Sequence, residues 1–492
     1  GRDPCGELAD LHHTRFRILS RLGDVAAMAE ITAELLSVAE RLALPRATAE
    51  ANLADSICCL WRDDIAGARE RALFALQGAG SFSEGRELAI RCLAHNELAA
   101  IGMYGGDHRF MRYYAERGLD LAKRLGMPFV EVILRLRLAN ANFMSGAWEE
   151  SLQDSIDAIG LARRIGQPRD LACALAERAL ILAMRGDLAL AEGCISEIRQ
   201  VFGRGTSADR GVFGVVEIAE ATLALERGQG ERALAIARRF LRPSASAATS
   251  VGLTAAKRPT GFALLAEAQV AAGDGVGALE TARRIIGLGP AGTPYLAALA
   301  SRAEGLARQA LREKQPAMEC LRQAHEEFTA LEMPFEAARS LLELAEVGGQ
   351  ETGARDQTPS PRSLSPERAA QQSLATFERL GARRYAERAR RLLRGFGFSP
   401  PVTLLPRLGG VSVSERELEV ARLVAEGLTA TEIARRLTIS PRTVTTHLEH
   451  IYARLHISSR AALVRQVMEA GLLNPQDHNT KSIRCFPDVH GR

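Results

Sequence analysis

The sequence TATEIARRLTISPRTVTTHL, residues 429–448, contains two helix starts separated by a short turn. Thr429 and Glu432 have the spacing of a capping box, in which each side chain bonds a backbone N–H of the other residue. Ser440 can cap the second helix, and Pro441 suits its first position because the missing N–H is not needed there. With three residues between the two helices, the pattern predicts a helix-turn-helix.

The second of these helices has two faces of different chemistry. At about 100° per residue, its apolar residues form one inner stripe that faces a core. The opposite side is expected to enter the major groove of DNA. The stripe is Val444, Leu448, Ile451 and Leu455, the opposite face is Arg442, Thr446, Glu449, His450 and Ala453, and Thr445 and His447 flank the stripe.

Two more helices are predicted on either side of this pair. Ser414 and Glu417 form another capping box, and the helix that follows is expected to end at Gly427. A last helix from Ser459 to about Ala470 can cover the core or pair with a second copy of the chain.

Five short motifs occur here in one order: VSERE at 413–417, EGL at 426–428, EIA at 432–434, TVTTHL at 443–448 and LHISSR at 455–460. Together they resemble the four-helix DNA-binding domain of LuxR-type bacterial regulators. In that family the third helix reads bases, residues around the two central helices hold phosphates, and the fourth helix dimerises. The resemblance implies base reading by Thr445, Thr446 and Glu449, DNA contact by His450, backbone contact by Arg442, Thr443, His447 and Arg460, and dimerisation through Leu463, Val467 and Met468.

The domain departs from the family at two of these positions. Thr445 stands where many members have Lys, and Glu449 stands near a position that is often basic. A carboxylate there can accept from cytosine N4 but repels phosphate. Residues 411–473 contain eight Arg and seven Glu, so we expect one copy to bind modestly and two copies to be needed.

The composition of the whole chain predicts an all-α protein. Of its 492 residues 47% are hydrophobic but only 5% are aromatic, so its cores are built from Ala and Leu. The net charge of +4 is too small to indicate a generally basic, nucleic-acid-coating protein. Eight scattered Cys without C-x-x-C spacing, no long apolar run and no signal peptide favour a reducing cytoplasm and no membrane contact.

From about residue 12 to residue 347 the chain repeats a helical hairpin with a period of forty residues or slightly more. The hairpins resemble tetratricopeptide repeats, clearest at residues 138–164, and about eight of them are expected to stack into a superhelix with a concave inner surface. The hairpin turns are predicted at Gly106, Gly146, Gly186, Gly228 and Gly273, with Lys314-Gln315 in the next place, and helix stops at Pro45, Pro128, Pro168 and Pro334 keep the same phase.

The array is expected either to bind a peptide, an effector or another copy, or to act only as a spacer. Its densest aromatic and basic cluster could line a groove or belong to the core and the solvated surface: Tyr104, Arg109, Arg112, Tyr113 and Tyr114. The predicted domains are an array at 1–348, a flexible linker at 349–366, a closing helical pair at 367–398, a hinge at 399–410, the DNA-binding domain at 411–473 and a disordered tail at 474–492. The LGA and YAERA motifs at 380–382 and 385–389 resemble the segment that closes the array in large LuxR-family regulators.

Signatures of enzymes are absent from the sequence. The large ATP-binding members of the LuxR family carry a nucleotide-binding module, but this chain has no G-x-x-x-x-G-K-[ST] motif. Because the chain begins at Gly1, such a module is expected upstream if ATP is used at all. His447 and His450 lie one turn apart, but no third metal ligand converges on them, so no metal, cofactor or catalytic residue is predicted.

The sequence therefore predicts a bacterial transcription regulator that binds operator DNA as a homodimer and receives a protein or small-molecule effector on its array. The alternative is a helical-repeat interaction scaffold whose helix-turn-helix does not bind DNA. A third possibility is the region-four fold of sigma factors, against which the motif at 455–460 and the helix after it argue. Salt separates the first two hypotheses, because binding that neutralises phosphates weakens steeply as salt rises.

Overall fold

The computed structural model describes most of the chain between residues 11 and 470. It does not describe residues 12–13, 17–18, 20–24, 43–44, 63, 80–84, 203–209, 242–256, 290–291, 350–363, 399–406, 409–410, 414, 438 and 456 within that range. Most of the predicted linker and hinge and the whole predicted tail lie outside the described residues. The chain divides into two compact units, residues 1–400 and 401–492.

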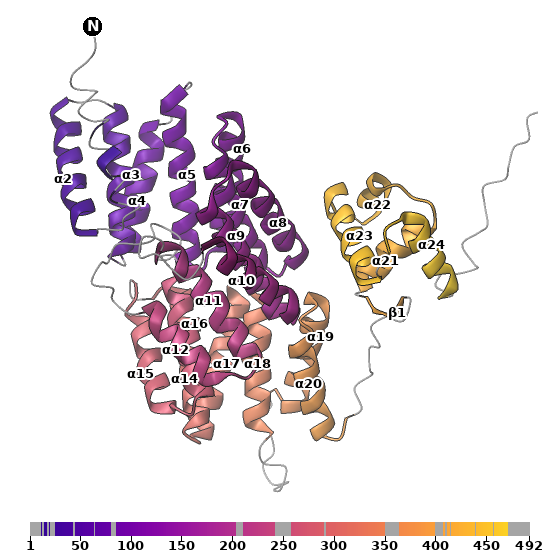
Figure 1. The fold of residues 1–492 in the computed structure, drawn as a ribbon. Helices are drawn as coiled ribbons and strands as arrows, with labels where there is room; N and C mark the ends of the chain where they lie inside the picture. The colour runs from indigo at the N-terminus through magenta and orange to yellow at the C-terminus, as the bar shows by residue number, and fades with distance from the viewer. Residues whose placement is uncertain are drawn as a thin grey trace, which may run out of the picture. The chain divides into compact units, whose positions relative to one another are not determined.

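The first unit is the predicted array of helical hairpins, and the all-α fold class is confirmed (Figure 1). Each helix packs against the next one in the chain. Its described helices are α2 (Val25–Leu42), α3 (Pro45–Trp61), α4 (Ile65–Gly78), α5 (Gly85–Gly105), α6 (His108–Arg124), α7 (Pro128–Met144), α8 (Trp148–Ile165), α9 (Pro168–Arg185), α10 (Leu188–Phe202), α11 (Arg210–Glu226), α12 (Gly230–Leu241), α14 (Arg258–Ala271), α15 (Gly275–Ile286), α16 (Pro294–Ala310), α17 (Lys314–Ala330), α18 (Pro334–Gly348), α19 (Pro366–Leu380) and α20 (Arg383–Gly395). None of the described helices is both long and apolar enough to cross a membrane.

The hairpin turns need a left-handed residue, and glycine supplies it at the predicted places. The five predicted turn glycines have φ between 70° and 94°, a region that side chains with a Cβ rarely adopt. The next turn differs from the prediction: Lys314 begins α17, and the left-handed residue is Arg312, with φ of 63°. The repeat therefore continues with a strained residue where glycine is missing.

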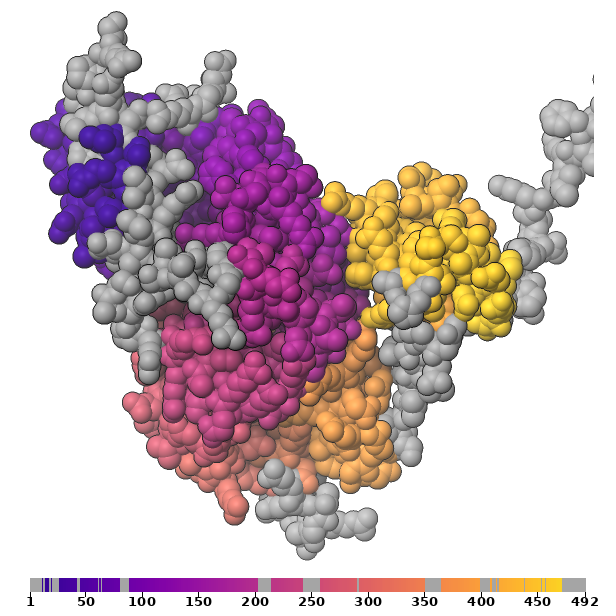
Figure 2. Space-filling view, viewed as in Figure 1, coloured from indigo at the N-terminus to yellow at the C-terminus, as the bar shows by residue number. Residues whose placement is uncertain are grey.

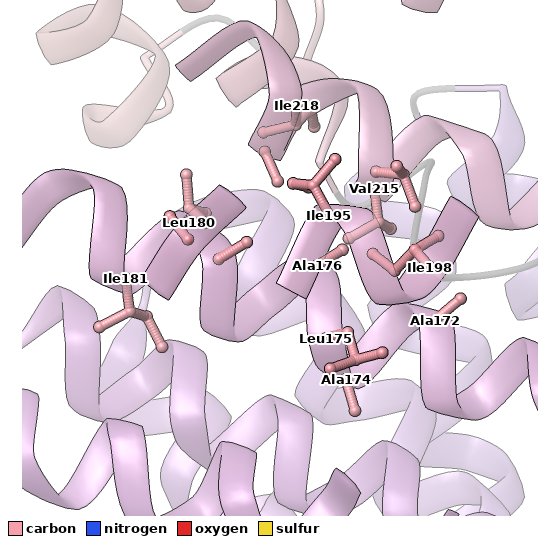
Figure 3. Close-up of a cluster of buried hydrophobic side chains, with 14 of the residues drawn as sticks. Ala172, Ala174, Leu175, Ala176, Leu180, Ile181, Ile195, Ile198, Val215 and Ile218 are labelled. Atoms are coloured by element: carbon pink, nitrogen blue, oxygen red, sulfur yellow. The ribbon is translucent and has the colours of Figure 1, made fainter. Parts of the chain in front are cut away.

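Small side chains let the helices of the array approach closely. In the largest core cluster, α9 contributes Ala172, Ala176 and Ala179, which lie among branched residues such as Ile195 of α10 and Ile218 of α11 (Figure 3). Alanine has a small side chain and a high helix propensity. The helices can therefore pack densely without many aromatic rings.

The array closes on itself, since hairpin turns in its first half meet helix starts in its second half. The turn after α5 lies against the start of α16, and the hydroxyl of Tyr104 donates to the carbonyl of Leu288 at 2.7 Å. The turn after α7 lies against the start of α18, where a Cβ on Gly146 would be 2.8 Å from Cγ of Pro334. Figure 2 shows the two halves as one continuous surface.

An aromatic cluster joins the two halves at the α7 and α18 end of this closure. Its central ring is Phe335, whose centroid lies 4.9 Å from that of Trp148 and 5.1 Å from that of Tyr385. Phe143 stacks on Trp148 at 5.1 Å, and Phe377 lies 6.0 Å from Phe335. These rings come from five helices, so the C-terminal pair α19 and α20 is fixed to the array.

Buried charges cross the interior of the array. Arg302 of α16 donates two hydrogen bonds to Glu343 at 2.6 and 2.9 Å and one to Glu267 at 2.6 Å. Arg339 donates to the other oxygen of Glu267 at 2.7 Å. Burial raises the pKa of Glu267, but Arg302 and Arg339 outweigh it and lower the pKa to about 2. Elsewhere in the interior, burial raises the pKa of Glu97 to about 7, and Arg137 only partly opposes the shift.

The aromatic and basic cluster near residue 110 is divided between the core, the closure and the surface of the array. Tyr104 is fully buried, Arg109 pairs with Glu332 across the closure, and Arg112 donates to Asn142 at 2.8 Å. Tyr113 is exposed and carries the guanidinium of Arg117 on its ring, 3.5 Å from the centroid. The cluster therefore does not form one continuous groove lining.

The closing pair begins one residue earlier than predicted. Pro366 is the first residue of α19, and the Ser365 hydroxyl accepts from the N–H of Arg368 at 3.4 Å. The basic residues of α20 are largely neutralised within the array, through the pairs Arg383–Asp187, Arg384–Glu226, Arg388–Glu346, Arg390–Glu378 and Arg394–Glu387. The pairs with Asp187, Glu226 and Glu346 join α20 to other parts of the array.

Candidate nucleic-acid interface

The second unit is a small helical domain with one short β hairpin. Strands β1 (Arg407–Leu408) and β2 (Val411–Ser412) pair antiparallel ahead of helices α21 (Glu415–Ala425), α22 (Ala430–Leu437), α23 (Pro441–Leu455) and α24 (Arg460–Glu469). Leu408 is fully buried in the core of this unit. The predicted hinge at 399–410 thus extends too far, because its last part already packs as domain.

Helices α22 and α23 are capped by hydrogen bonds from the predicted residues. The N–H and the hydroxyl of Thr429 donate to the Glu432 carboxylate at 2.8 and 2.7 Å and lower its pKa, and the N–H of Glu432 donates to the Thr429 hydroxyl at 3.4 Å. The hydroxyl of Ser440 accepts from the N–H of Thr443 at 3.0 Å. Both caps are confirmed, whereas the predicted cap at Ser414 lies outside the described residues.

Helix α23 packs its predicted stripe inward and leaves a polar side outward. Val444 and Ile451 are fully buried, and Leu448 and Leu455 pack against the same core. Arg442, Thr445 and Glu449 are exposed and share the outer side of the helix. They form the surface that a DNA groove would meet first.

Other residues of the expected DNA-binding set are covered. Thr443, Thr446 and His447 are 6%, 7% and 2% exposed, and His450 is half-buried. The Thr443 hydroxyl is 2.8 Å from that of Ser440 in the cap, and the Thr446 hydroxyl donates to the carbonyl of Arg442 at 3.2 Å. This burial differs from the expectation that Thr446 and His447 lie open to the groove.

Arg460 has a different role from the expected phosphate contact. Its guanidinium donates to the carbonyls of Val424 at 3.2 Å and Leu428 at 2.5 Å, next to the end of α21. Carbonyls at a helix C-terminus lack intrahelical partners, and a cation there is favourable. Arg460 therefore ties α24 to α21.

Replacing Arg460 by methionine should destabilise the second unit by about 1–3 kcal/mol, because the carbonyls of Val424 and Leu428 lose a charged donor. A fragment of residues 401–492 would be unfolded in urea alongside Arg465→Met, whose parent residue is exposed. Equal midpoints for the two variants would contradict the role assigned to Arg460.

The expected dimer face on α24 is mostly used inside the unit. Leu463 and Val467 are fully buried in the core that contains Val444, whereas Met468 is 57% exposed. Leu463 and Val467, which were predicted as dimer contacts, thus lie on the stripe that covers the core of one copy. Met468 is the predicted residue that the structure leaves on the surface.

Some charged side chains of the second unit are paired with each other. Buried Glu417 accepts from Arg454 at 2.9 Å, and Arg416 pairs with Glu419 at 2.7 Å. Arg435 on α22 is exposed and has no ion pair among the described residues, so it adds positive charge beside the helix-turn-helix. The prediction did not single it out, although the Arg435-Arg436 doublet was a visible signal. No three His, Cys, Asp or Glu side chains are grouped for metal binding in the described part of the chain.

Comparison with known proteins assigns a class to this unit. Residues 411–467 match the family described as "Bacterial regulatory proteins, luxR family". A putative HTH-type transcriptional regulator of Mycobacterium bovis is 48% identical over 66 residues, which are 13% of this chain and 8% of that protein. The transcriptional activator protein ExaE of Pseudomonas putida is 36% identical over 99 residues, 18% of this chain and 46% of ExaE. Residues 411–467 are thus a LuxR-type helix-turn-helix domain, and the chain spans less than a tenth of the length of the first of these relatives.

Two solved structures show distant similarity to this chain. A crystal structure of a Rap protein complexed with competence and sporulation factor has a TM-score of 0.42 and 14% identity, and covers 69% of this chain and 86% of the Rap chain. The apo form of RapI has a TM-score of 0.33 and 9% identity, and covers 70% of this chain and 97% of RapI.

Proposed function

We propose that the protein is a bacterial transcription regulator whose second unit binds double-stranded operator DNA. The observation that carries this proposal is the LuxR-family match over residues 411–467, which coincides with a folded four-helix unit. Relatives of this segment are named as transcriptional regulators. The place of action is the cytoplasm, at the nucleoid when bound.

The exposed side of α23 supplies the proposed contacts. The exposed Thr445 and Glu449 would meet base edges, where Glu449 suits the N4 amino group of cytosine. Arg442 and Arg435 would hold phosphates. Thr443, Thr446, His447 and His450 would contact DNA where the bound state uncovers them.

Two further parts of the proposal concern assembly and control. Two copies would bind two half-sites about one DNA turn apart, with Met468 of α24 in the contact between copies. The array would receive a protein or small-molecule effector and shift the population of DNA-binding states.

Arg442→Gln is expected to weaken binding on every sequence and to reduce the slope of log affinity against log salt by about 1, because one phosphate contact is lost. Glu449→Gln is expected to strengthen non-specific binding, since a negative charge leaves the groove side. Operators selected from genomic fragments at two salt concentrations provide the DNA, and fluorescence anisotropy of the full chain provides the affinities.

Arg322→Gln on α17 is the matched control for the loss of charge, because Arg322 pairs with Glu319 and Glu326 in the array. An unchanged salt slope for Arg442→Gln would contradict the assigned face. If the wild-type chain selects no salt-sensitive site at all, the interaction-scaffold hypothesis replaces the regulator.

A further inference from the structure

A cavity of about 490 Å³ opens where the array closes on itself. It is lined from the first half by α4, α5 and the start of α6, and from the second half by the start of α16 and by the end of α17 with the turn that follows it. This volume is in the range of small-molecule sites, which often lie between separately packed parts of a protein. A molecule in the cavity would touch both halves at once.

The wall of the cavity combines apolar surface with two guanidinium groups and two carboxylates. Ile101, Phe110 and Leu331 supply apolar atoms. Of the acidic lining residues, Asp107 accepts the N–H of Phe110 at 2.9 Å, and Glu332 pairs with Arg109. Arg69 has no ion pair among the described residues, and its guanidinium lies over the Phe110 ring, 4.6 Å from the centroid.

The pair that spans the cavity is a weak one. Arg109 and Glu332 are 74% and 54% exposed, and exposed pairs contribute little stability. Glu332 has a φ of 55°, whereas Gly126 and Gly166 occupy the corresponding turns of earlier repeats. Its left-handed backbone costs about 1–2 kcal/mol relative to glycine. The closure is therefore strained at Glu332, which lines the cavity. At the α7 and α18 end of the closure, by contrast, the aromatic cluster around Phe335 packs the two halves together.

We propose that this cavity binds a small organic anion with an apolar body, whose carboxylate meets Arg69 and whose body contacts Ile101 and Leu331. Arg109 can turn from Glu332 to the same carboxylate, because both side chains of that pair are exposed. The ligand links the two halves and makes the closure firmer. The inference rests on the proposed function only in naming this cavity as the effector site.

Gly105 offers a variant that blocks the cavity. It lines the space, its φ is not positive, and a Cβ built on it meets nothing within 4 Å. A leucine there enters the cavity without a clash at its Cβ, so Gly105→Leu fills the site while the array stays folded. Arg71→Gln is the control for the loss of charge in Arg69→Gln. Arg71 lies on α4 like Arg69, but it pairs with Asp55 at 3.0 Å.

The test is titration of the full chain with 2-naphthoate, followed by ligand-observed NMR, with 2-naphthamide as the uncharged analogue. The expected result is binding of the carboxylate to wild type and Arg71→Gln, with affinity about tenfold lower or worse for Arg69→Gln and Gly105→Leu, since one charge-assisted bond is lost or the space is filled. Hydrogen exchange at the α5–α6 turn should slow when the carboxylate is bound.

Three results would overturn the proposal: no binding to wild type, equal binding of the amide, or full binding to Arg69→Gln and Gly105→Leu. None of these measurements involves DNA, so a negative result leaves the regulator proposal standing. Conversely, a chain that selects no operator can still bind 2-naphthoate.

Discussion

Gly106→Ala is expected to destabilise the array by about 3–4 kcal/mol, through a left-handed alanine and an overpacked contact added together. Gly106 has a φ of 71°, and a Cβ there would overlap Cβ and Cγ of Tyr295. These atoms are the root of a buried side chain at the start of α16 and cannot swing away. The midpoint of urea unfolding of the full chain, followed by circular dichroism, measures the loss.

Gly126→Ala separates the two causes. Gly126 has a φ of 60°, but a Cβ there meets nothing within 4 Å, so this variant should lose only the backbone part, about 1–2 kcal/mol. Equal losses for both variants would show that the first half of the array does not press on α16. A larger loss for Gly106→Ala confirms that the array is closed in solution.

Glu267→Gln should cost about 3–5 kcal/mol at neutral pH, because it leaves two buried guanidinium groups with one fewer anion. Arg302 and Arg339 are 3% and 6% exposed, and both bond Glu267. Glu319→Gln is the matched control, since its partner Arg322 is exposed and such a pair contributes little. Thermal unfolding of the full chain at several pH values reports both variants.

The pH dependence of this effect follows from the pKa of Glu267, which is about 2 in the folded chain against an ordinary value of 4.5. A carboxyl whose folded pKa is depressed stabilises the fold above the unfolded pKa, by roughly 3 kcal/mol here, and that stability is lost as pH falls from about 4.5 towards 2. The difference between wild type and Glu267→Gln should therefore shrink between pH 7 and pH 3. A constant difference over that range would contradict the depressed pKa.

Local signals predicted the helix-turn-helix well because its rules are local. The bonds between Thr429 and Glu432, and the cap at Ser440, involve residues three apart, so spacing alone places them. The inner stripe of α23 follows from helical periodicity. The turn glycines are equally local, because a left-handed residue is required whatever surrounds it.

The sequence could not show whether a residue of the second unit packs within its own domain or contacts another molecule. Leu463 and Val467 were available for either a core or a dimer, and only the packing of α24 on α21 assigns them to the core. Arg460 had an equally open choice between phosphate and protein carbonyls until the end of α21 was placed beside it. Burial of Thr446 and His447 was likewise outside what periodicity can report.

The repeat period by itself predicted that the chain from about residue 12 to residue 347 forms a stack of helical hairpins, since each hairpin must bury its apolar face on the next. The closure was decided only by the tertiary structure. Tyr104 and Leu288 are 184 residues apart in the sequence, and no local rule relates them, yet the Tyr104 hydroxyl donates a hydrogen bond to the Leu288 carbonyl. Whether such distant turns meet depends on the curvature accumulated over many helix contacts, and that sum has no signature at any single position.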